Sequence, residues 1–454
     1  MSSVLILTYH FYPSNEIGAR RVTALARYLA ERGVRVVVVS GFGPQSLALD
    51  SEIFPRVTAI QVQRPSRRLL NALVALKRRF FRSRASVPNA STPDSQSAPV
   101  VHRTYLGLAF RALRNLYFRT LFVVDDYKRW SWRASRAAVL AGKRHGVEVI
   151  VASGPPHSAQ LAAARAAAKL GIPYVADLRD PWSDTVSEAT ATGRIEIRFV
   201  RFLERWAINQ AAMITSTSDA VATLLGQRYP EVRSRIRVIR NGYDGGIATG
   251  LSRTSGRLSV LFAGELYVGR DPFPFLEALE WLLTRPGTDA TRIQAIFMGN
   301  VRAYSGRSLS DWLRGKRSES VVKILPPQPP EAVVAAVADA TLLLNLAQQQ
   351  PLSVPAKTFE HLASGREILL ICERGCETAT LVSGIRGVNV VDPAEPEALQ
   401  DILLDLYRRH ALQGAAMAPS EAEAGKYSRA SANAQFHAAL ESLAGSTDAD
   451  PVIG

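Results

Sequence analysis

Short apolar runs alternate with longer amphipathic stretches along most of this 454-residue chain. The runs are rich in valine and isoleucine and apolar nearly throughout, the pattern of strands buried on both faces of a parallel sheet. Helix-like stretches, such as 17–32 and 156–170, lie between most of them. In the first half we expect strands at 4–10, 34–41, 57–63, 147–154, 174–180, 213–218 and 235–242.

The second half repeats this alternation. Its expected strands are 258–266, 293–300, 321–328, 341–348, 367–372 and 388–392. Its expected helices are 271–285, 308–315, 330–339, 355–364 and 394–409. Strand–helix alternation in two halves predicts two doubly wound, Rossmann-like α/β domains. Ligands of such sheets bind beyond the carboxyl ends of the strands, so two facing domains predict a cleft between them.

A glycine- and serine-rich stretch at 242–257 is suited to a hinge between the domains. Residues 85–100 are rich in Ser, Pro and Ala, which predicts a disordered insertion. We expect an N-terminal domain over 1–242, a C-terminal domain over 243–418, a helix over 419–444 and a flexible tail over 445–454.

The composition excludes several classes of protein. The only cysteines are Cys372 and Cys376, which argues against a disulfide scaffold and a four-cysteine zinc site and indicates reduced thiols in a cytosolic protein. The N-terminus has no positive region before its apolar run, so we expect no signal peptide. No stretch offers about 20 consecutive apolar residues, so we expect no membrane span.

The net charge of +15 is unevenly distributed and favours anionic partners. Residues 64–84 hold eight basic residues and no acidic one, and residues 101–145 hold ten against Asp125 and Asp126. Basic and apolar residues are interleaved in the first segment, and the second adds aromatics such as "WSWR". These features predict an anionic membrane surface as partner. The alternative is a solvated basic helix packed on the domain.

Candidate chemistry in the first half lies at the ends of expected strands. Gly18 opens the helix after the first strand, where a glycine lets backbone N–H groups approach a phosphate; a plain turn glycine is the alternative. His157 follows strand 147–154 and should point into the cleft, unless it is structural. Asp180 could bind a substrate hydroxyl or phosphate, whereas Asp177 fits better as the partner of an arginine.

In the second half, Arg270 follows a glycine-framed loop and is placed to clamp a phosphate, the alternative being a surface arginine. Lys357 and Glu360 are three residues apart near the start of the helix expected at 355–364. They should share one face and reach toward the helix start, where an anion is favoured. A nucleoside diphosphate would suit this position, with phosphate on Lys357 and ribose on Glu360. The alternative is an ion pair on a solvated face.

The motifs that carry these residues resemble a known family. They are "HFYPSNEIGARRVTALARYLAERGVRVVVVSG", "SGPPHSAQLAA", "YVADLRDPW", "VIRNGYD", "FAGELYVGRDP" and "VPAKTFEHLASGREIL". In this order, over about residues 4–410, they resemble the retaining glycosyltransferases of family 4, which have the GT-B fold. The subgroup most similar in pattern builds bacterial surface polysaccharides.

The resemblance implies transfer of a sugar from a nucleotide donor to an acceptor hydroxyl, with retention and without a metal or other cofactor. A lipid-linked or saccharide acceptor, an anionic membrane surface and a cytoplasmic location at the inner face of the membrane are the expected setting, with no nucleic acid as partner. The last helix would cross back to the first domain. The implied catalytic residues are His157 and Asp180, and the implied donor-binding residues are Gly18, Arg270, Lys357, Thr358 and Glu360.

The chain departs from the family pattern at two positions. Leu352 stands where the family often has a glutamate, and Glu265 where it often has an arginine. Both departures bear on the sugar-binding contacts. Three other functions stay open: a nucleotide-sugar epimerase of the same fold, a catalytically inactive binding partner, and a basic nucleic-acid-binding protein. No helix-turn-helix, zinc or RNP-type motif supports the last.

Overall fold

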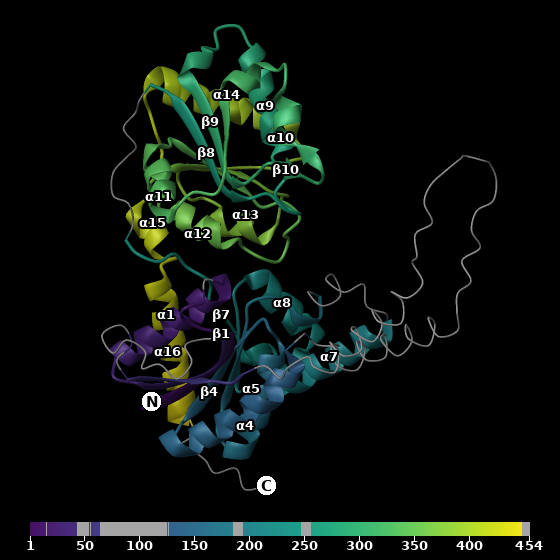
Figure 1. Cartoon of the computed structure of the whole chain (residues 1–454), viewed down its shortest axis with the longest axis vertical. Helices are drawn as coiled ribbons and strands as arrows, with labels where there is room; N and C mark the ends of the chain where they lie inside the picture. Colours follow the sequence, from purple (N-terminus) through teal and green to yellow (C-terminus); the bar gives the residue numbers. More distant parts are fainter. Residues whose placement is uncertain are drawn as a thin grey trace, which may run out of the picture.

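The computed structural model shows two α/β domains, one above the other in Figure 1. This confirms the expected fold class of two parallel-sheet, Rossmann-like domains. Within the described part of the chain, no helix is long and apolar enough to cross a membrane. The structure describes residues 1–14, 16–42, 54, 56–63, 125, 127–184, 194–246 and 256–446. The expected insertion at 85–100 and the basic segment at 64–84 lie outside these ranges.

The N-terminal sheet has seven parallel strands in the order β3-β2-β1-β4-β5-β6-β7. Its central strands β4 and β5 are buried along their length because side chains on both faces are covered, with valine and isoleucine opening β4. In register, Leu5 lies opposite Val37 on one side and Ile150 on the other. The strands are β1 (Ser3–His10), β2 (Arg35–Phe42), β3 (Val57–Gln61), β4 (Val149–Gly154), β5 (Tyr174–Leu178), β6 (Met213–Ser216) and β7 (Ile236–Val238).

Helices cover both faces of this sheet. The helices of this domain are α1 (Ile17–Glu31), α4 (Lys128–His145), α5 (Ser158–Leu170), α7 (Arg194–Asn209) and α8 (Asp219–Arg228), with a short helix η2 (Pro230–Arg235). α1 packs on one face, and α4 and α5 pack on the other. α5 is rich in alanine, and its buried small side chains let α4 lie close to it. Trp130 of α4 is fully buried in this core, so it is not one of the aromatics available at the surface.

The C-terminal sheet has six parallel strands in the order β12-β9-β8-β13-β14-β15. They are β8 (Leu258–Glu265), β9 (Ile293–Asn300), β12 (Val322–Leu325), β13 (Leu342–Leu346), β14 (Glu367–Ile371) and β15 (Val388–Val391), beside a hairpin of β10 (Ala303–Tyr304) and β11 (Arg307–Ser308). Leucine and phenylalanine side chains from β8, β9 and β13 pack with α9 and α14 in one core.

The helices of this domain differ from the expected ones mainly at their ends. α12 begins after Pro355, one residue later than expected, and no side chain caps its first turn. α9 begins at Phe273, where the carboxylate of Asp271 accepts a hydrogen bond from the N–H of Phe273. The helices are α9 (Phe273–Thr284), α10 (Leu309–Leu313), α11 (Pro330–Asp339), α12 (Ala356–Leu362), α13 (Glu377–Val382) and α14 (Pro396–Tyr407), with shorter helices η3 (Ala290–Arg292), η4 (Arg317–Ser320) and η5 (Arg408–Gln413).

The chain then returns to the first domain through two helices, not the single helix expected over 419–444. α15 (Glu421–Gly425) is started by a capping box between Ser420 and Glu423, and α16 (Arg429–Ser446) follows a break. The break occurs where the backbone of Ser428 pairs with that of Tyr243. α16 lies along α1 (Figure 1), with Phe436 and Leu440 in the same core as α1.

Candidate active site

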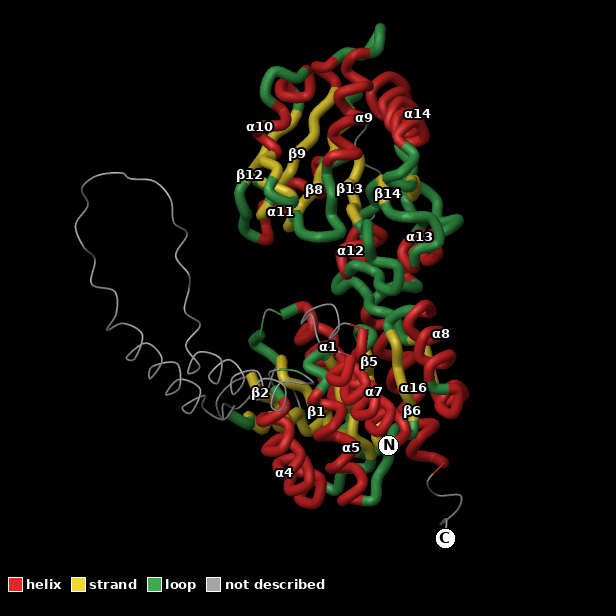
Figure 2. Tube along the Cα trace, turned by 90° about the vertical axis from the view of Figure 1, so that its right-hand side faces the viewer, coloured by secondary structure: helices red, strands yellow, loops and turns green. Residues whose placement is uncertain are grey.

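The segments that follow the strands of one domain lie next to those of the other. α12 and α13 of the C-terminal domain are beside α1 and α8 of the N-terminal domain (Figure 2). Arg20 of α1 and Glu360 of α12 form an ion pair across the boundary, with N and O 3.8 Å apart. The Ser218 hydroxyl donates to the carbonyl oxygen of Leu352 at 2.6 Å. The carboxyl ends of both sheets therefore meet at this boundary, where doubly wound sheets bind ligands.

Two cationic side chains converge at the end of β8. The ammonium of Lys357 donates to the carbonyl of Ala263 and lies 4.8 Å from the ring of Phe262. The guanidinium of Arg270 lies over the ring of Tyr267, 4.2 Å from its centroid. Gly264 separates the two cations: a Cβ built there would overlap the Lys357 ammonium and lie 3.8 Å from Arg270. With a φ of 153°, this position also disfavours any other residue.

The electrostatics of this cluster favour an anion. Burial, and then the like charge of Arg270, lower the pKa of Lys357 to about 8, although Glu360 opposes the change. Burial and the same two cations lower the pKa of His361 to about 3, so its ring is neutral. Within the described residues, neither Lys357 nor Arg270 forms an ion pair with a carboxylate, and the Nε of Arg270 has no hydrogen-bond partner.

The other predicted residues of α12 point elsewhere. We expected Lys357 and Glu360 to share one direction, but Lys357 turns toward β8 while the side chain of Glu360 is 56% exposed and faces Arg20. Thr358 is buried, and its hydroxyl accepts a hydrogen bond from the amide of Asn345 at 3.0 Å. The Thr358 side chain is therefore already engaged in holding α12 on β13.

In the N-terminal domain, Arg179 occupies the space that was expected to admit a phosphate. A Cβ built on Gly18 would overlap the Arg179 guanidinium, so the glycine makes room for this side chain. Arg179 Nε donates to the carbonyl of Gly154 at 3.0 Å, and its Nη2 donates to that of Pro155 at 2.5 Å. Burial lowers the pKa of Arg179. This cation at the end of β5 was not among the predicted site residues.

His157 was expected to point into the cleft, but it is buried. Its ring stacks on Trp182 with centroids 5.3 Å apart, and within the described residues neither ring nitrogen has a hydrogen-bond partner. Burial, followed by the charge of Arg179, lowers its pKa to about 3, so the imidazole is neutral near pH 7. Asp180 is partly buried; burial raises its pKa, and Arg179 partly offsets that effect.

One carboxylate of the C-terminal domain, that of Glu377, binds groups of the N-terminal domain. Glu377, the first residue of α13, is buried and accepts hydrogen bonds from the N–H groups of Asp219 and Ala220, at 3.0 and 2.9 Å. It also pairs with Arg240 at 2.6 Å. These N–H groups open α8, where a negative charge is favoured. Glu377 therefore fixes α13 against the N-terminal domain, close to the segment that leads into α12.

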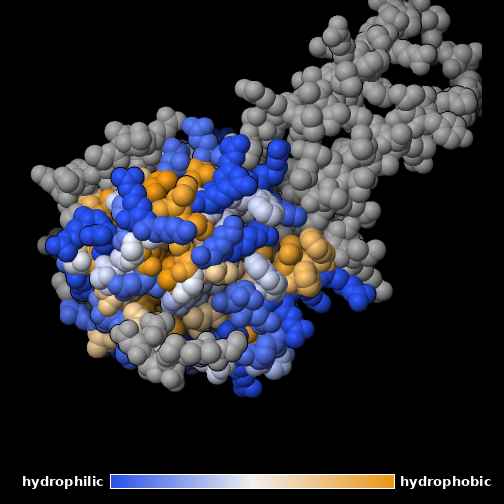
Figure 3. Space-filling view, turned by 90° about the horizontal axis from the view of Figure 1, so that it is seen from below, coloured by the Kyte–Doolittle hydropathy of each residue, from blue (hydrophilic) through white to orange (hydrophobic). Residues whose placement is uncertain are grey.

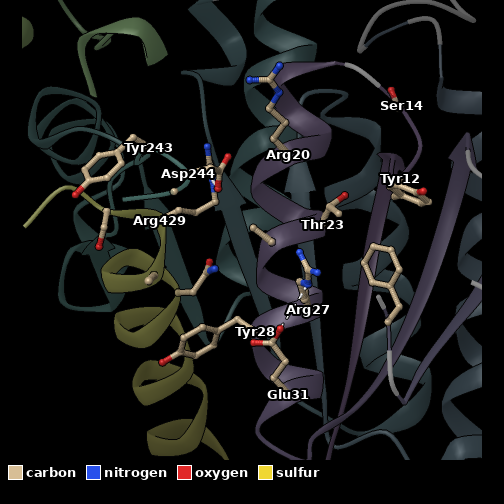
Figure 4. A pocket seen from close by; sticks show the side chains of 16 residues that line it. Tyr12, Ser14, Arg20, Thr23, Arg27, Tyr28, Glu31, Tyr243, Asp244 and Arg429 are labelled. Carbon is tan, nitrogen blue, oxygen red and sulfur yellow. Dashed lines mark hydrogen bonds and ion pairs between the residues drawn. The ribbon is translucent and has the colours of Figure 1, made fainter. Parts of the chain in front are cut away.

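A groove of about 490 Å³ lies between α1 and α16 (Figure 4), and Arg20, the partner of Glu360, is among the residues that line it. Arg27 projects into it and pairs with Glu31 at 3.4 Å, and Arg429 pairs with Asp244 at 2.6 Å. The charges of these two arginines are thus compensated locally. In the part of the chain that the structure describes, no group of three metal-ligating side chains gathers at a common point.

Comparisons with known proteins agree with this architecture. No curated protein matches the sequence. Among solved structures, HepE of Anabaena in complex with UDP and glucose is similar, with a TM-score of 0.56 and 15% identity over 97% of this chain and 100% of that one. The α,α-trehalose 6-phosphate synthase of Burkholderia multivorans has a TM-score of 0.58 and 13% identity over 98% of this chain and 100% of that one.

A third similar structure is the lipopolysaccharide outer core galactosyltransferase WaaB in its apo form, with a TM-score of 0.57 and 12% identity over 97% of this chain and 99% of that one. At such identities the likeness concerns the fold. The family model described as a glycosyl transferase 4-like domain matches residues 18–242. The chain therefore has the GT-B fold, and its residues 18–242 are similar to the glycosyl transferase 4-like domain family.

Proposed function

We propose that this protein transfers a sugar from a nucleoside-diphosphate sugar to an acceptor hydroxyl, with retention of the anomeric configuration. The observation that carries the proposal is the pair of cations, Lys357 and Arg270, that converge at the end of β8 without a carboxylate partner in the described residues. Sugar transfer releases a nucleoside diphosphate, and fixed positive charge at the departing oxygens stabilises the transition state. Two buried or half-buried cations at one strand end supply that charge.

Each residue then has a role in the proposal. Lys357 and Arg270 bind the diphosphate, and Glu360 accepts hydrogen bonds from the ribose hydroxyls. Glu360 must first leave Arg20, and an exposed pair of this kind contributes only about 0–1 kcal/mol. His157 and Asp180 act at the transferred sugar, with His157 as a neutral imidazole. A buried imidazole whose nitrogens lack protein partners can bind a sugar hydroxyl after a modest rearrangement.

The position of Leu352 bears on the transferred sugar. Its backbone carbonyl accepts the hydrogen bond of Ser218, so this part of the loop is held by the N-terminal domain. Its apolar side chain packs against the core of that domain. We infer that sugar contacts come from other groups, including backbone atoms at Gly264 and Glu265. The reaction needs no metal in this proposal, since Lys357 and Arg270 supply the charge.

We further propose a lipid-linked acceptor, and synthesis of a bacterial surface polysaccharide or glycolipid at the cytoplasmic face of the membrane. The motif resemblance to surface-polysaccharide enzymes supports this setting. The similar fold of WaaB, a lipopolysaccharide galactosyltransferase by name, agrees with it.

The proposed function is tested by incubating the protein with uridine, guanosine, thymidine and cytidine diphosphate sugars in the presence of a chelator. We expect one donor class to release its nucleoside diphosphate, and the sugar product to keep the donor's anomeric configuration when read by NMR. An inverted product would refute retention. Conversion of the sugar to a stereoisomer without an acceptor would identify an epimerase. No turnover by a folded sample that still binds nucleotide would identify an inactive partner.

A further inference from the structure

Three large aromatic side chains are exposed on neighbouring helices of the N-terminal domain. Trp132 of α4 is 55% exposed, and Phe199 and Phe202 of α7 are 43% and 62% exposed. α5 packs between these helices and contacts both. Large exposed aromatics that cluster on one face indicate a surface that meets a partner. We call the outer surface of α4, α5 and α7 the aromatic–basic face.

Cations from the same helices lie over these aromatic rings. The guanidinium of Arg165 in α5 lies 4.5 Å from the ring of Trp132 and 5.7 Å from that of Trp206. The ammonium of Lys128 in α4 lies 5.7 Å from the ring of Phe199. These contacts join the three helices, so the exposed aromatics belong to one continuous surface.

The charge of this face is strongly positive. α4 contains six lysines and arginines and no acidic residue, and α5 contains Arg165 and Lys169 and none. On α7, Arg198, Arg201 and Arg205 are exposed, while Glu204 is buried. Of these three arginines of α7, Arg205 pairs with Glu231 at 2.8 Å, and within the described residues Arg198 and Arg201 form no ion pair with a carboxylate. Apolar residues on the lower end of this domain, where α4 lies, are surrounded by hydrophilic ones (Figure 3).

We propose that the aromatic–basic face docks on an anionic lipid bilayer. Aromatic side chains favour the headgroup level of a membrane, where the ring is partly apolar and the surroundings are polar. Arginines and lysines around them are attracted to anionic headgroups, and long basic side chains extend from an apolar face to the phosphates. Trp132, Phe199 and Phe202 insert among the headgroups, and Arg198 and Arg201 contact the phosphates.

This surface is made of described residues and stands apart from the Lys357 cluster. The docking of this face on lipid does not depend on the proposed function. Only its purpose, which is to bring the enzyme near a lipid-linked acceptor, rests on that function. The alternative partner is a single-stranded nucleic acid, because such molecules also bind basic surfaces that carry aromatic side chains. The two phenylalanines favour lipid, because their rings stack on each other with centroids 6.4 Å apart and form one apolar projection.

The test is flotation of the full chain with vesicles of neutral phosphatidylcholine, and of phosphatidylcholine with phosphatidylglycerol. The wild type is expected to float with the anionic vesicles at least about tenfold more than with the neutral ones. The double variant Phe199→Ser, Phe202→Ser and the double variant Arg198→Glu, Arg201→Glu should each lose about tenfold or more of this binding. Matched controls on the C-terminal domain are Val334→Ser with Leu412→Ser, and Arg285→Glu with Lys323→Glu, all at exposed positions and all expected to float as wild type.

Several outcomes would overturn the proposal. Equal flotation with neutral and anionic vesicles would overturn it. Equal flotation of the wild type and both face variants would also overturn it, because another segment would then bind the lipid. Binding of random RNA that both face variants abolish, without vesicle binding, would assign the face to nucleic acid. Donor hydrolysis without vesicles is measured in parallel and should be unchanged in the face variants. If the wild type hydrolyses no donor at all, that result counts against the proposed glycosyltransferase function and leaves the membrane proposal unaffected.

Discussion

Replacing Lys357 with alanine is expected to lower kcat/KM for the nucleotide-sugar donor by about 100- to 1,000-fold, the usual cost of removing one group that stabilises developing negative charge. The side chain is half-buried against Ala263 and the ring of Phe262, so it acts where water screens charge less than at the open surface. Arg270 remains in the variant and retains part of the stabilisation. Initial-rate kinetics over a range of donor concentrations measure the effect.

Lys323→Ala serves as the control, because Lys323 is exposed on β12 and should leave the kinetics unchanged. Gly264→Ala tests the geometry, since its methyl group would overlap the Lys357 ammonium. We expect kcat/KM of Gly264→Ala to fall at least as far as that of Lys357→Ala. Lys357→Ala should keep the unfolding curve of the wild type, whereas Gly264→Ala should unfold more easily because its φ of 153° disfavours alanine. If kcat/KM of Lys357→Ala stays within about threefold of the wild type, Lys357 does not bind the leaving diphosphate.

Replacing Asp177 with alanine is expected to lower the free energy of unfolding by about 3–5 kcal/mol, the cost of leaving a buried charge without its partner. Arg21 donates to both carboxylate oxygens of Asp177, at 2.9 and 3.1 Å, and Ser153 and Thr215 each donate at 2.7 Å. All four side chains are buried. The cluster joins α1, β4, β5 and β6 at the end of the sheet that faces the C-terminal domain.

The pH dependence of this effect has a definite sign. Burial raises the pKa of Asp177, but the charge and hydrogen bonds of Arg21 and the two hydroxyls outweigh burial and hold the pKa below its ordinary value. Stability from Asp177 is therefore complete above the pKa of an unfolded aspartate, about 3.9, and is lost as the pH falls below it.

Urea unfolding near neutral pH measures the loss of stability in the Asp177→Ala variant. Asp311→Ala, which removes an exposed pair with Arg314, should cost less than about 1 kcal/mol. An equal cost for both variants would contradict the account.

The sheet architecture could be predicted from the sequence because the central strands are buried on both faces. Runs such as "VRVVVVSG" leave no polar face, and only a sheet covered by helices on both sides accommodates them. The split between α15 and α16 was missed because it depends on a distant backbone pairing of Ser428 with Tyr243. β7 ends at Val238, earlier than expected, and the next two carbonyls, of Ile239 and Arg240, accept hydrogen bonds from the side chain of Arg21, which lies far away in the sequence.

The sequence identifies several residues of the candidate site individually, but it does not predict how their side chains are arranged in space. Arg270 is a candidate from sequence because it follows a glycine-framed loop, and Lys357 because it lies near the start of an expected helix. The two side chains lie close together at Gly264 because of the way α12 packs on the sheet. The sequence pattern around each residue does not reveal this packing. Arg179 was passed over for Asp180 because neighbouring charges at a strand end look alike in sequence. The burial of His157 depends on Trp182, and a stacking partner 25 residues away leaves no periodic signal.

The most direct test of the central claim, that Lys357 and Arg270 form a diphosphate site, is a calorimetric titration. The protein is titrated with uridine and guanosine diphosphates, and with the corresponding nucleosides, at about pH 7 and about pH 9.5. Because the pKa of Lys357 is about 8 and a bound diphosphate favours its charged form, binding should take up protons near this pH. We predict that one diphosphate binds far more tightly than its nucleoside, and that its affinity falls by at most about tenfold per unit of pH above 8. A folded protein that binds diphosphate and nucleoside equally, with no change between the two pH values, would contradict the claim.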